Sequence, residues 1–127
     1  MRRNGEILMI VDDERALLAL AEEIAAQLGY GPVGFDSSCA ALDALIAQPE
    51  RFDVVLTDEA MPDLVGSELA FEIRRMRPTI PIVLMSGYGG AQLTNRAAEI
   101  GVNEVLRKPL HRLDLAESLA RVLQSAV

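Results

Sequence analysis

Five polar residues of this sequence combine acidic, basic and hydroxyl groups that suit a metal ion and a phosphate. Three are carboxylates, and a hydroxyl and an ammonium group complete the set: Asp12, Asp13, Asp58, Ser86 and Lys108. If the three carboxylates lie close together, each pair repels by about 1–4 kcal/mol at ~4 Å, depending on the local dielectric. Protonation relieves this repulsion, and so does a hard divalent cation. Carboxylate oxygens together with water are typical ligands of Mg²⁺.

The same residue types support phosphoryl transfer. A carboxylate can attack phosphorus and form an aspartyl phosphate, and the reaction mainly requires positioning of the reactants and neutralisation of charge. Mg²⁺ supplies one cation and Lys108 a second. The Ser86 hydroxyl can donate a hydrogen bond to a phosphoryl oxygen of the product. The sequence therefore predicts a magnesium-dependent phosphoryl acceptor, provided that the fold brings these residues together.

Short apolar runs typical of buried strands alternate along the chain with longer amphipathic segments typical of helices. The predicted strands cover residues 7–11, 33–35, 53–57, 80–85 and 102–107, and the predicted helices cover residues 15–28, 37–47, 67–76, 91–100 and 112–123. This fivefold βα alternation predicts a parallel sheet with helices on both faces. We expect the second strand, which is short and follows Pro32, to lie at an edge.

The predicted fold gives the polar residues a common location. Ligands of open parallel sheets bind beyond the carboxyl ends of the strands. Asp12 and Asp13 follow the first strand, Asp58 ends the third, Ser86 ends the fourth and Lys108 ends the fifth. We therefore expect them to converge on one rim of the sheet.

The first predicted helix carries apolar residues on more than one face. We expect its inward stripe to consist of Leu17, Leu20, Ala21, Ile24 and Leu28. Leu18 and Ala25 lie beside this stripe, either as filler or as part of a surface that docks a helical partner.

Four short motifs, in order and each at a predicted strand end, resemble the receiver domain of two-component response regulators. They are Val11-Asp12-Asp13, residues 57–62 (TDEAMP) with Gly66, Met85-Ser86-Gly87, and Lys108-Pro109. The resemblance covers nearly the whole chain. It implies a flavodoxin-like, doubly wound α/β fold with a five-stranded parallel sheet in the order 2-1-3-4-5 and five helices. It also implies a single domain over residues 1–127, with an ordered core at about residues 6–124.

The resemblance implies an acceptor and a metal site. Asp58 matches the family's phosphoacceptor. Asp12 and Asp13 match the acid pair that binds Mg²⁺, with Asp13 the more direct ligand, and Asp58 completes the carboxylates. The backbone carbonyl of Ala60 would be a further ligand.

The resemblance also implies the remaining roles and the partner. Ser86 matches the family's hydroxyl residue and Lys108 its lysine, and Pro109 favours a cis peptide that aims this lysine. Family members receive the phosphoryl group from a histidine kinase or a histidine phosphotransfer domain and change shape. They act as phosphoacceptors, limited to self-phosphorylation and slow autodephosphorylation, rather than as enzymes on external substrates.

The switch position departs from the family pattern. The family usually has Tyr or Phe three residues before the lysine, and here that residue is Val105. Valine cannot swing a ring between inward and outward states, so the usual coupling to Ser86 is in doubt. Tyr88 is a candidate substitute or a gate over the site.

Three other function classes fit this fold less well. An Asp-nucleophile phosphohydrolase typically needs a second Asp two residues after the nucleophile, where this chain has Ala60. A flavin site needs a glycine- and hydroxyl-rich loop to cradle phosphate after the first strand, where the acids would repel it. A phosphorylation-independent scaffold is disfavoured by the intact acids and mildly favoured by Val105.

Bulk properties limit the setting. The length of 127 residues fits one domain, and a net charge of −7 argues against direct binding to nucleic acid or an anionic membrane. One cysteine excludes an internal disulfide, and no apolar segment has the length of a membrane span, so we expect a cytoplasmic location. A homodimer is left open. Residues 86–89 (SGYG) resemble receivers attached to hybrid histidine kinases.

Overall fold

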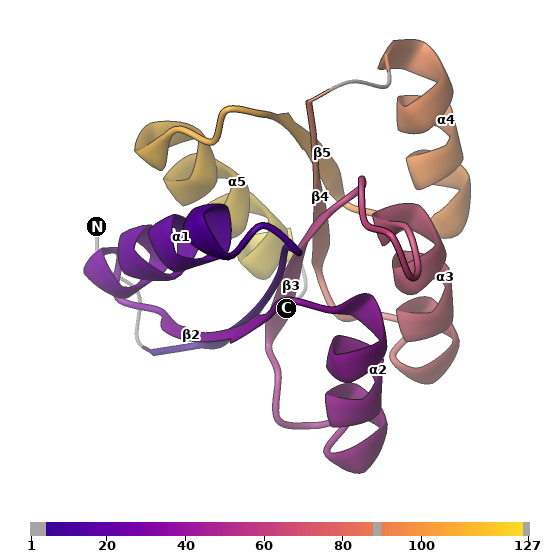
Figure 1. Ribbon diagram of the computed structural model, residues 1–127, viewed down its shortest axis with the longest axis horizontal. Coiled ribbons are helices and arrows are strands. Elements are labelled where there is room, and N and C mark those ends of the chain that lie inside the picture. Colours follow the sequence, from indigo (N-terminus) through magenta and orange to yellow (C-terminus); the bar gives the residue numbers. More distant parts are fainter. Residues whose placement is uncertain (1–4, 88–89, 126–127) are drawn as a thin grey trace.

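The computed structural model describes residues 5–87 and 90–125, and strands and helices alternate throughout (Figure 1). The strands are β1 (Ile7–Val11), β2 (Gly31–Phe35), β3 (Val54–Asp58), β4 (Ile82–Ser86) and β5 (Glu104–Arg107). The helices are α1 (Arg15–Gln27), α2 (Ser38–Ala47), α3 (Gly66–Met76), α4 (Gly90–Ile100) and α5 (Arg112–Ser125). Each predicted element is present, and the fivefold βα alternation is confirmed.

The five strands form one parallel sheet in the order β2-β1-β3-β4-β5. Helices α1 and α5 cover one face of the sheet, and α2, α3 and α4 cover the other (Figure 1). This is the flavodoxin-like fold that the sequence predicts, with β2 at an edge as expected. No helix within the described residues is long and apolar enough to cross a membrane.

Two aliphatic clusters lie on the two faces of the sheet. In β1, Met9 and Val11 belong to the cluster beneath α2, α3 and α4, whereas Leu8 and Ile10 belong to the cluster beneath α1 and α5. All four side chains have no exposed area. Since successive side chains of a strand point to opposite faces, a central strand covered on both sides must be continuously apolar. This burial fixes the strands whose carboxyl ends carry the acids.

The orientation of α1 corrects the predicted stripe. Leu18, Ala21 and Ala25 are buried, whereas Leu17 and Leu20 are 37% and 48% exposed. The small side chains of Ala21 and Ala25 face the sheet. The expectation that Leu17 and Leu20 face inward is therefore wrong, and these two leucines form an apolar surface.

Helix α5 is fixed to β5 by one carboxylate. Glu104 accepts hydrogen bonds from Arg121 Nε and Nη2, each at 2.8 Å, and from the hydroxyl of buried Ser118 at 2.8 Å. Chiefly because of the hydrogen bonds from Arg121, the pKa of Glu104 lies below its ordinary value of 4.5. The carboxylate anchors the helix that follows the Lys108 loop.

We expect Glu104→Gln to lower stability in a pH-dependent way. A carboxyl group whose pKa is depressed by folding stabilises the native state above its unfolded pKa, and this contribution is lost as the pH falls through the folded pKa. The free energy of unfolding in urea should therefore be lower in the variant at about pH 7, and the difference should shrink towards about pH 3. A constant difference across this range would contradict the assignment.

Candidate functional site

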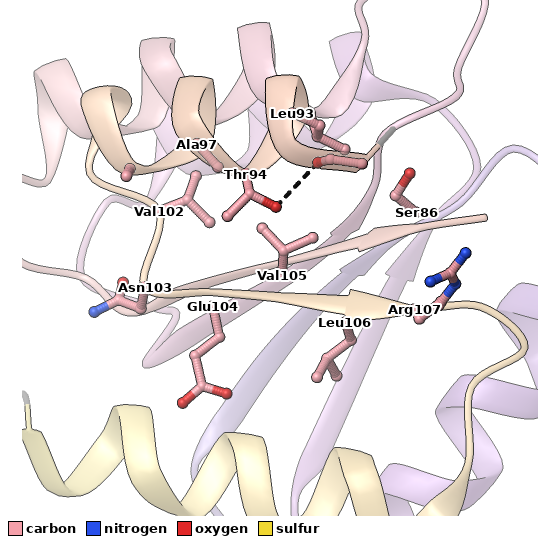
Figure 2. A pocket seen from close by; sticks show the side chains of 12 residues that line it. Ser86, Leu93, Thr94, Ala97, Val102, Asn103, Glu104, Val105, Leu106 and Arg107 are labelled. Carbon is pink, nitrogen blue, oxygen red and sulfur yellow. Dashed lines mark hydrogen bonds between the residues drawn. The ribbon is translucent and has the colours of Figure 1, made fainter. Parts of the chain in front are cut away.

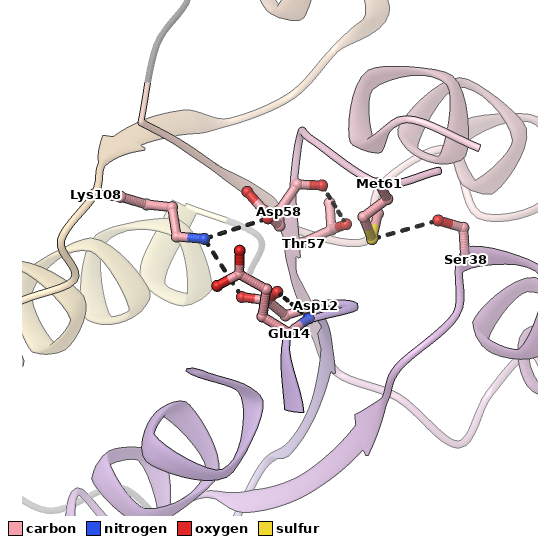
Figure 3. Close-up of polar contacts among 7 residues, drawn as sticks. All are labelled: Asp12, Glu14, Ser38, Thr57, Asp58, Met61 and Lys108. Carbon is pink, nitrogen blue, oxygen red and sulfur yellow. Dashed lines mark hydrogen bonds and ion pairs between the residues drawn. The ribbon is translucent and has the colours of Figure 1, made fainter. Parts of the chain in front are cut away.

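Asp58 and Lys108 meet at the carboxyl rim of the sheet. Asp58 is the last residue of β3, and 4% of its surface is exposed. Lys108, in the loop after β5, places its Nζ 3.2 Å from Asp58 Oδ2 and 3.5 Å from Asp12 Oδ2 (Figure 3). The structure thus brings together residues that are 96 and 50 positions apart in the chain.

Asp12, Asp13 and Asp58 form a compact acidic pocket. One carboxylate oxygen from each residue lies within 4.8 Å of the other two. The backbone N–H of Glu14 donates to Asp12 Oδ1 at 3.0 Å and fixes that carboxylate at the start of α1. Three oxygen donors of this kind fit a hard cation that keeps several waters, which is the chemistry of Mg²⁺. Ala60 is exposed in the loop after β3, and its carbonyl remains a predicted ligand.

Burial and charge shift the pKa values of the central pair. Burial raises the pKa of Asp58, and the Asp12 carboxylate adds to this, while Lys108 acts in the opposite direction. Burial acts to lower the pKa of Lys108, but the carboxylates of Asp58 and Asp12 outweigh it and the pKa is raised. Lys108 is therefore a cation at neutral pH. A divalent ion beside Asp58 would favour its ionised, nucleophilic form.

The ends of β4 and β5 hold Ser86 and Lys108 side by side. Ser86 is 9% exposed and closes β4, and its carbonyl accepts a hydrogen bond from the Lys108 N–H at 3.0 Å. In the sheet register Asp58 lies opposite Met85, the residue before Ser86. The Lys108-Pro109 peptide is cis, as expected.

Glu59 has a structural role that sequence reasoning missed. Its carboxylate accepts hydrogen bonds from the Ser67 N–H at 2.6 Å and from the Ser67 hydroxyl at 3.0 Å. The first amides of a helix need such acceptors, and Val65, at the N-cap of α3, has no side-chain acceptor. The sequence carried no direct signal for this contact, because it depends on the path of the loop between Glu59 and Ser67. Glu59 is not part of the carboxylate cluster that Asp12, Asp13 and Asp58 form.

Asp63 anchors the other side of the same loop. Its carboxylate accepts hydrogen bonds from the Cys39 N–H at 3.1 Å, the Ser37 hydroxyl at 3.0 Å and the Leu64 N–H at 2.9 Å. The backbone donor of Cys39 is the main reason that the pKa of Asp63 lies well below its ordinary value. The segment that follows Asp58 is thus tied to both α2 and α3.

Val105 faces α4 across a cavity. Figure 2 shows its side chain between β5 and Thr94 of α4, with Ser86 and Arg107 at one end. The cavity has a volume of about 370 Å³. Val105 lies in the wall of this cavity, and Tyr88, the candidate substitute or gate, lies outside the described residues. The switch role of either residue stays a prediction.

The sheet order and the acidic pocket define a flavodoxin-like domain whose carboxyl rim carries three clustered carboxylates beside a lysine. A sequence profile of the response regulator receiver domain family matches residues 8–120. The chain therefore belongs to the response regulator receiver domain family. Members of this family are generally phosphoacceptors rather than enzymes, and the acidic pocket is of the type that binds magnesium in receivers.

Several curated relatives are longer than this chain. It is 30% identical over 116 residues to the DNA-binding transcriptional regulator NtrC of a Bradyrhizobium strain, covering 91% of this chain and 24% of that protein. It is 30% identical over 127 residues to the transcriptional regulatory protein FixJ of Bradyrhizobium diazoefficiens, covering 100% and 58%. The chain thus spans less than two thirds of either relative. The response regulator receiver protein CpdR of Brucella abortus is 27% identical over 119 residues, covering 94% of this chain and 98% of that protein.

Solved structures agree with the fold. A response regulator receiver domain protein from Clostridium thermocellum superposes with a TM-score of 0.90 at 26% identity, covering 94% of this chain and 95% of that one. A receiver domain protein from Methanospirillum hungatei gives a TM-score of 0.88 at 26% identity, covering 96% of each chain.

Proposed function

We propose that this domain is a phosphoacceptor switch in which Asp58 takes a phosphoryl group from a histidine kinase or a histidine phosphotransfer domain. The observation that carries the proposal is the placement of the buried Asp58 carboxylate 3.2 Å from the Lys108 ammonium and beside the Asp12 and Asp13 carboxylates. A nucleophile, a cation and a metal-binding pair then lie at one point of the sheet rim. The phosphorylated domain would change shape and be read by a partner.

The transfer step follows from the residues present. A carboxylate oxygen of Asp58 forms a bond to phosphorus while the bond between phosphorus and the donor histidine nitrogen breaks. The electron pair leaves with the imidazole, which takes up a proton from solvent. The Lys108 ammonium group stabilises the negative charge of the phosphoryl oxygens, and the Ser86 hydroxyl donates a hydrogen bond to one of them. Asp12, Asp13, Asp58 and the carbonyl of Ala60 would hold Mg²⁺, which would supply further positive charge.

An apolar surface beside the acidic pocket supports a protein donor. Leu17 and Leu20 project from α1, and a cavity of about 350 Å³ between them and Pro109 and Leu110 extends to Lys108. A helical partner that covers these leucines would bring its histidine to the same rim. Exposed apolar surface next to a reactive group is typical of a transient docking site.

One structural feature favours a second candidate function, that of a scaffold that is not phosphorylated. Among the described residues that line the cavity beside Val105, none is an aromatic residue that could report on Ser86. The compact carboxylates and Lys108 support the switch instead, since a scaffold has no need of them. An external phosphohydrolase activity is disfavoured by alanine at position 60.

The test is intact mass after incubation with acetyl phosphate or phosphoramidate, with and without Mg²⁺. We expect the mass to rise by one phosphoryl group only with Mg²⁺, and hydroxylamine to remove the group. Absence of a gain, together with failure to accept phosphate from phosphorylated histidine kinases, would overturn the switch and favour the scaffold.

A further inference from the structure

A half-exposed aromatic ring lies in the groove between α3 and α4. Phe71 is 51% exposed, and the groove continues as a hollow on either side of it, with volumes of about 330 and 490 Å³. Both hollows are lined by Phe71 together with Glu99 and Ile100. A single exposed apolar residue is ordinary, but a large ring flanked by two hollows presents a projection and a recess on one surface. We call this surface the Phe71 groove.

The rim of the Phe71 groove carries charges of both signs. Its acidic residues are Glu68, Glu72 and Glu99, and its basic residues are Arg75 and Arg96. Arg74 also lines the groove, but its guanidinium donates to the carbonyls of Arg77, Ile80 and Gly101. Within the rim, Glu72 pairs with Arg75 at 3.6 Å. The whole chain carries a net charge of −7, so this groove, with three glutamates and two available arginines, is far closer to neutral than the molecule as a whole. At physiological salt, charges more than ~8 Å apart are largely screened. The charges within the groove therefore matter more than the net charge of the chain when two copies approach each other.

We infer that the Phe71 groove is the interface of a symmetric homodimer. In a two-fold interface the same patch meets itself, so it must carry both the projection and the recess and both signs of charge. The Phe71 groove meets these conditions: the ring of each copy fills a hollow of the other, and arginines of one copy meet glutamates of the other. A central aromatic anchor with a charged rim is also the usual anatomy of a protein interface.

This interface is independent of phosphoryl transfer. It is formed by α3, α4 and the Leu64 loop, whereas the donor-docking surface is formed by α1 and the Pro109 loop on the other face of the sheet. A dimer through the Phe71 groove therefore leaves Leu17 and Leu20 open. Its test does not require a phosphorylated protein, so the dimer and the proposed switch stand or fall separately.

Sedimentation velocity on the unphosphorylated chain at concentrations up to about 1 mM tests the dimer, because small interfaces bind in this range. The weight-average mass of the wild type should rise from 13.8 kDa towards twice that value. Phe71→Glu should remain at the monomer mass at every concentration. Arg96→Glu should weaken association at least several-fold, and the double swap Arg96→Glu with Glu99→Arg should restore much of it.

The matched control is Leu113→Glu, which places the same charge at a 67%-exposed leucine on α5. This variant should dimerise as the wild type does, and circular dichroism should show that all variants are folded. A wild type that stays at the monomer mass would overturn the inference. So would a dimer that Phe71→Glu leaves intact, or one that Leu113→Glu disrupts equally.

Discussion

Asp58→Asn is expected to abolish magnesium-dependent phosphoryl uptake while the fold survives. Asparagine has nearly the same shape but no nucleophilic carboxylate. Burial raises the pKa of Asp58, which means that the folded state disfavours its charge, and a neutral side chain removes that cost. We therefore expect the melting temperature to fall by no more than about 4 °C, the equivalent of roughly 1 kcal/mol for a domain of this size. Intact mass and thermal unfolding measure the two effects.

Glu59→Gln is the matched control for this experiment. Glu59 is the neighbouring carboxylate in the chain, but it is committed to the N–H and hydroxyl of Ser67. The amide oxygen of glutamine can accept the hydrogen bond from the Ser67 N–H, and its NH₂ group can donate to the Ser67 hydroxyl. Phosphoryl uptake should therefore match that of the wild type. Equal labelling of the wild type and Asp58→Asn would exclude Asp58 as the acceptor.

Gly66→Ala is expected to destabilise the domain by about 3 kcal/mol, a large effect for one methyl group. A Cβ at this position would lie 2.2 Å from the carbonyl oxygen of Asp58 and 2.8 Å from Leu84 Cδ1. The Asp58 oxygen belongs to the backbone of a central strand and cannot move aside cheaply. Since the clash is with the acceptor residue itself, phosphoryl uptake should fall as well. Urea unfolding gives the first effect and intact mass the second.

Gly87→Ala provides the contrast. Among the described residues beyond its chain neighbours, the nearest atom to a Cβ at this position is Lys108 Cβ at 4.0 Å, which leaves room for the methyl group. Its free energy of unfolding should equal or slightly exceed that of the wild type, because alanine restricts the unfolded chain. If Gly66→Ala unfolded at the same urea concentration as Gly87→Ala, the close packing of α3 against the Asp58 backbone would not require glycine at position 66.

The sequence predicted the order of elements well and their boundaries less well, because apolar character reports burial rather than strand pairing. The apolar pattern places Ile80 and Val102 in strands, and both are buried, yet β4 begins at Ile82 and β5 at Glu104. In α1, alanines and leucines occupy several faces, so helical periodicity permits more than one inward stripe. The choice of Leu18 and Ala25 over Leu17 and Leu20 depends on tertiary packing, which a single helix cannot reveal.

The acidic pocket was easier to predict than the hydrogen bonds that fix the loops around it. Asp12, Asp58 and Lys108 directly follow or end strands, and parallel strands bring such residues to one rim. The capping of α3 by Glu59 depends on the exact path of the loop over residues 59–66, and local sequence does not specify that path. The hollows around Phe71 likewise arise only when α3 and α4 are placed side by side.

The edge strand β2 has a consequence for solubility. The N–H of Gly31 donates to Glu6 on the β1 side, and because backbone groups alternate along a strand, the nitrogen of Pro32 faces the open edge. Proline has no N–H to offer, so a strand from another molecule would meet an interrupted row of donors there. β5, at the opposite edge, is four residues long. Short or proline-interrupted edges resist strand addition, which should keep this aliphatic sheet from aggregating at high cellular concentrations.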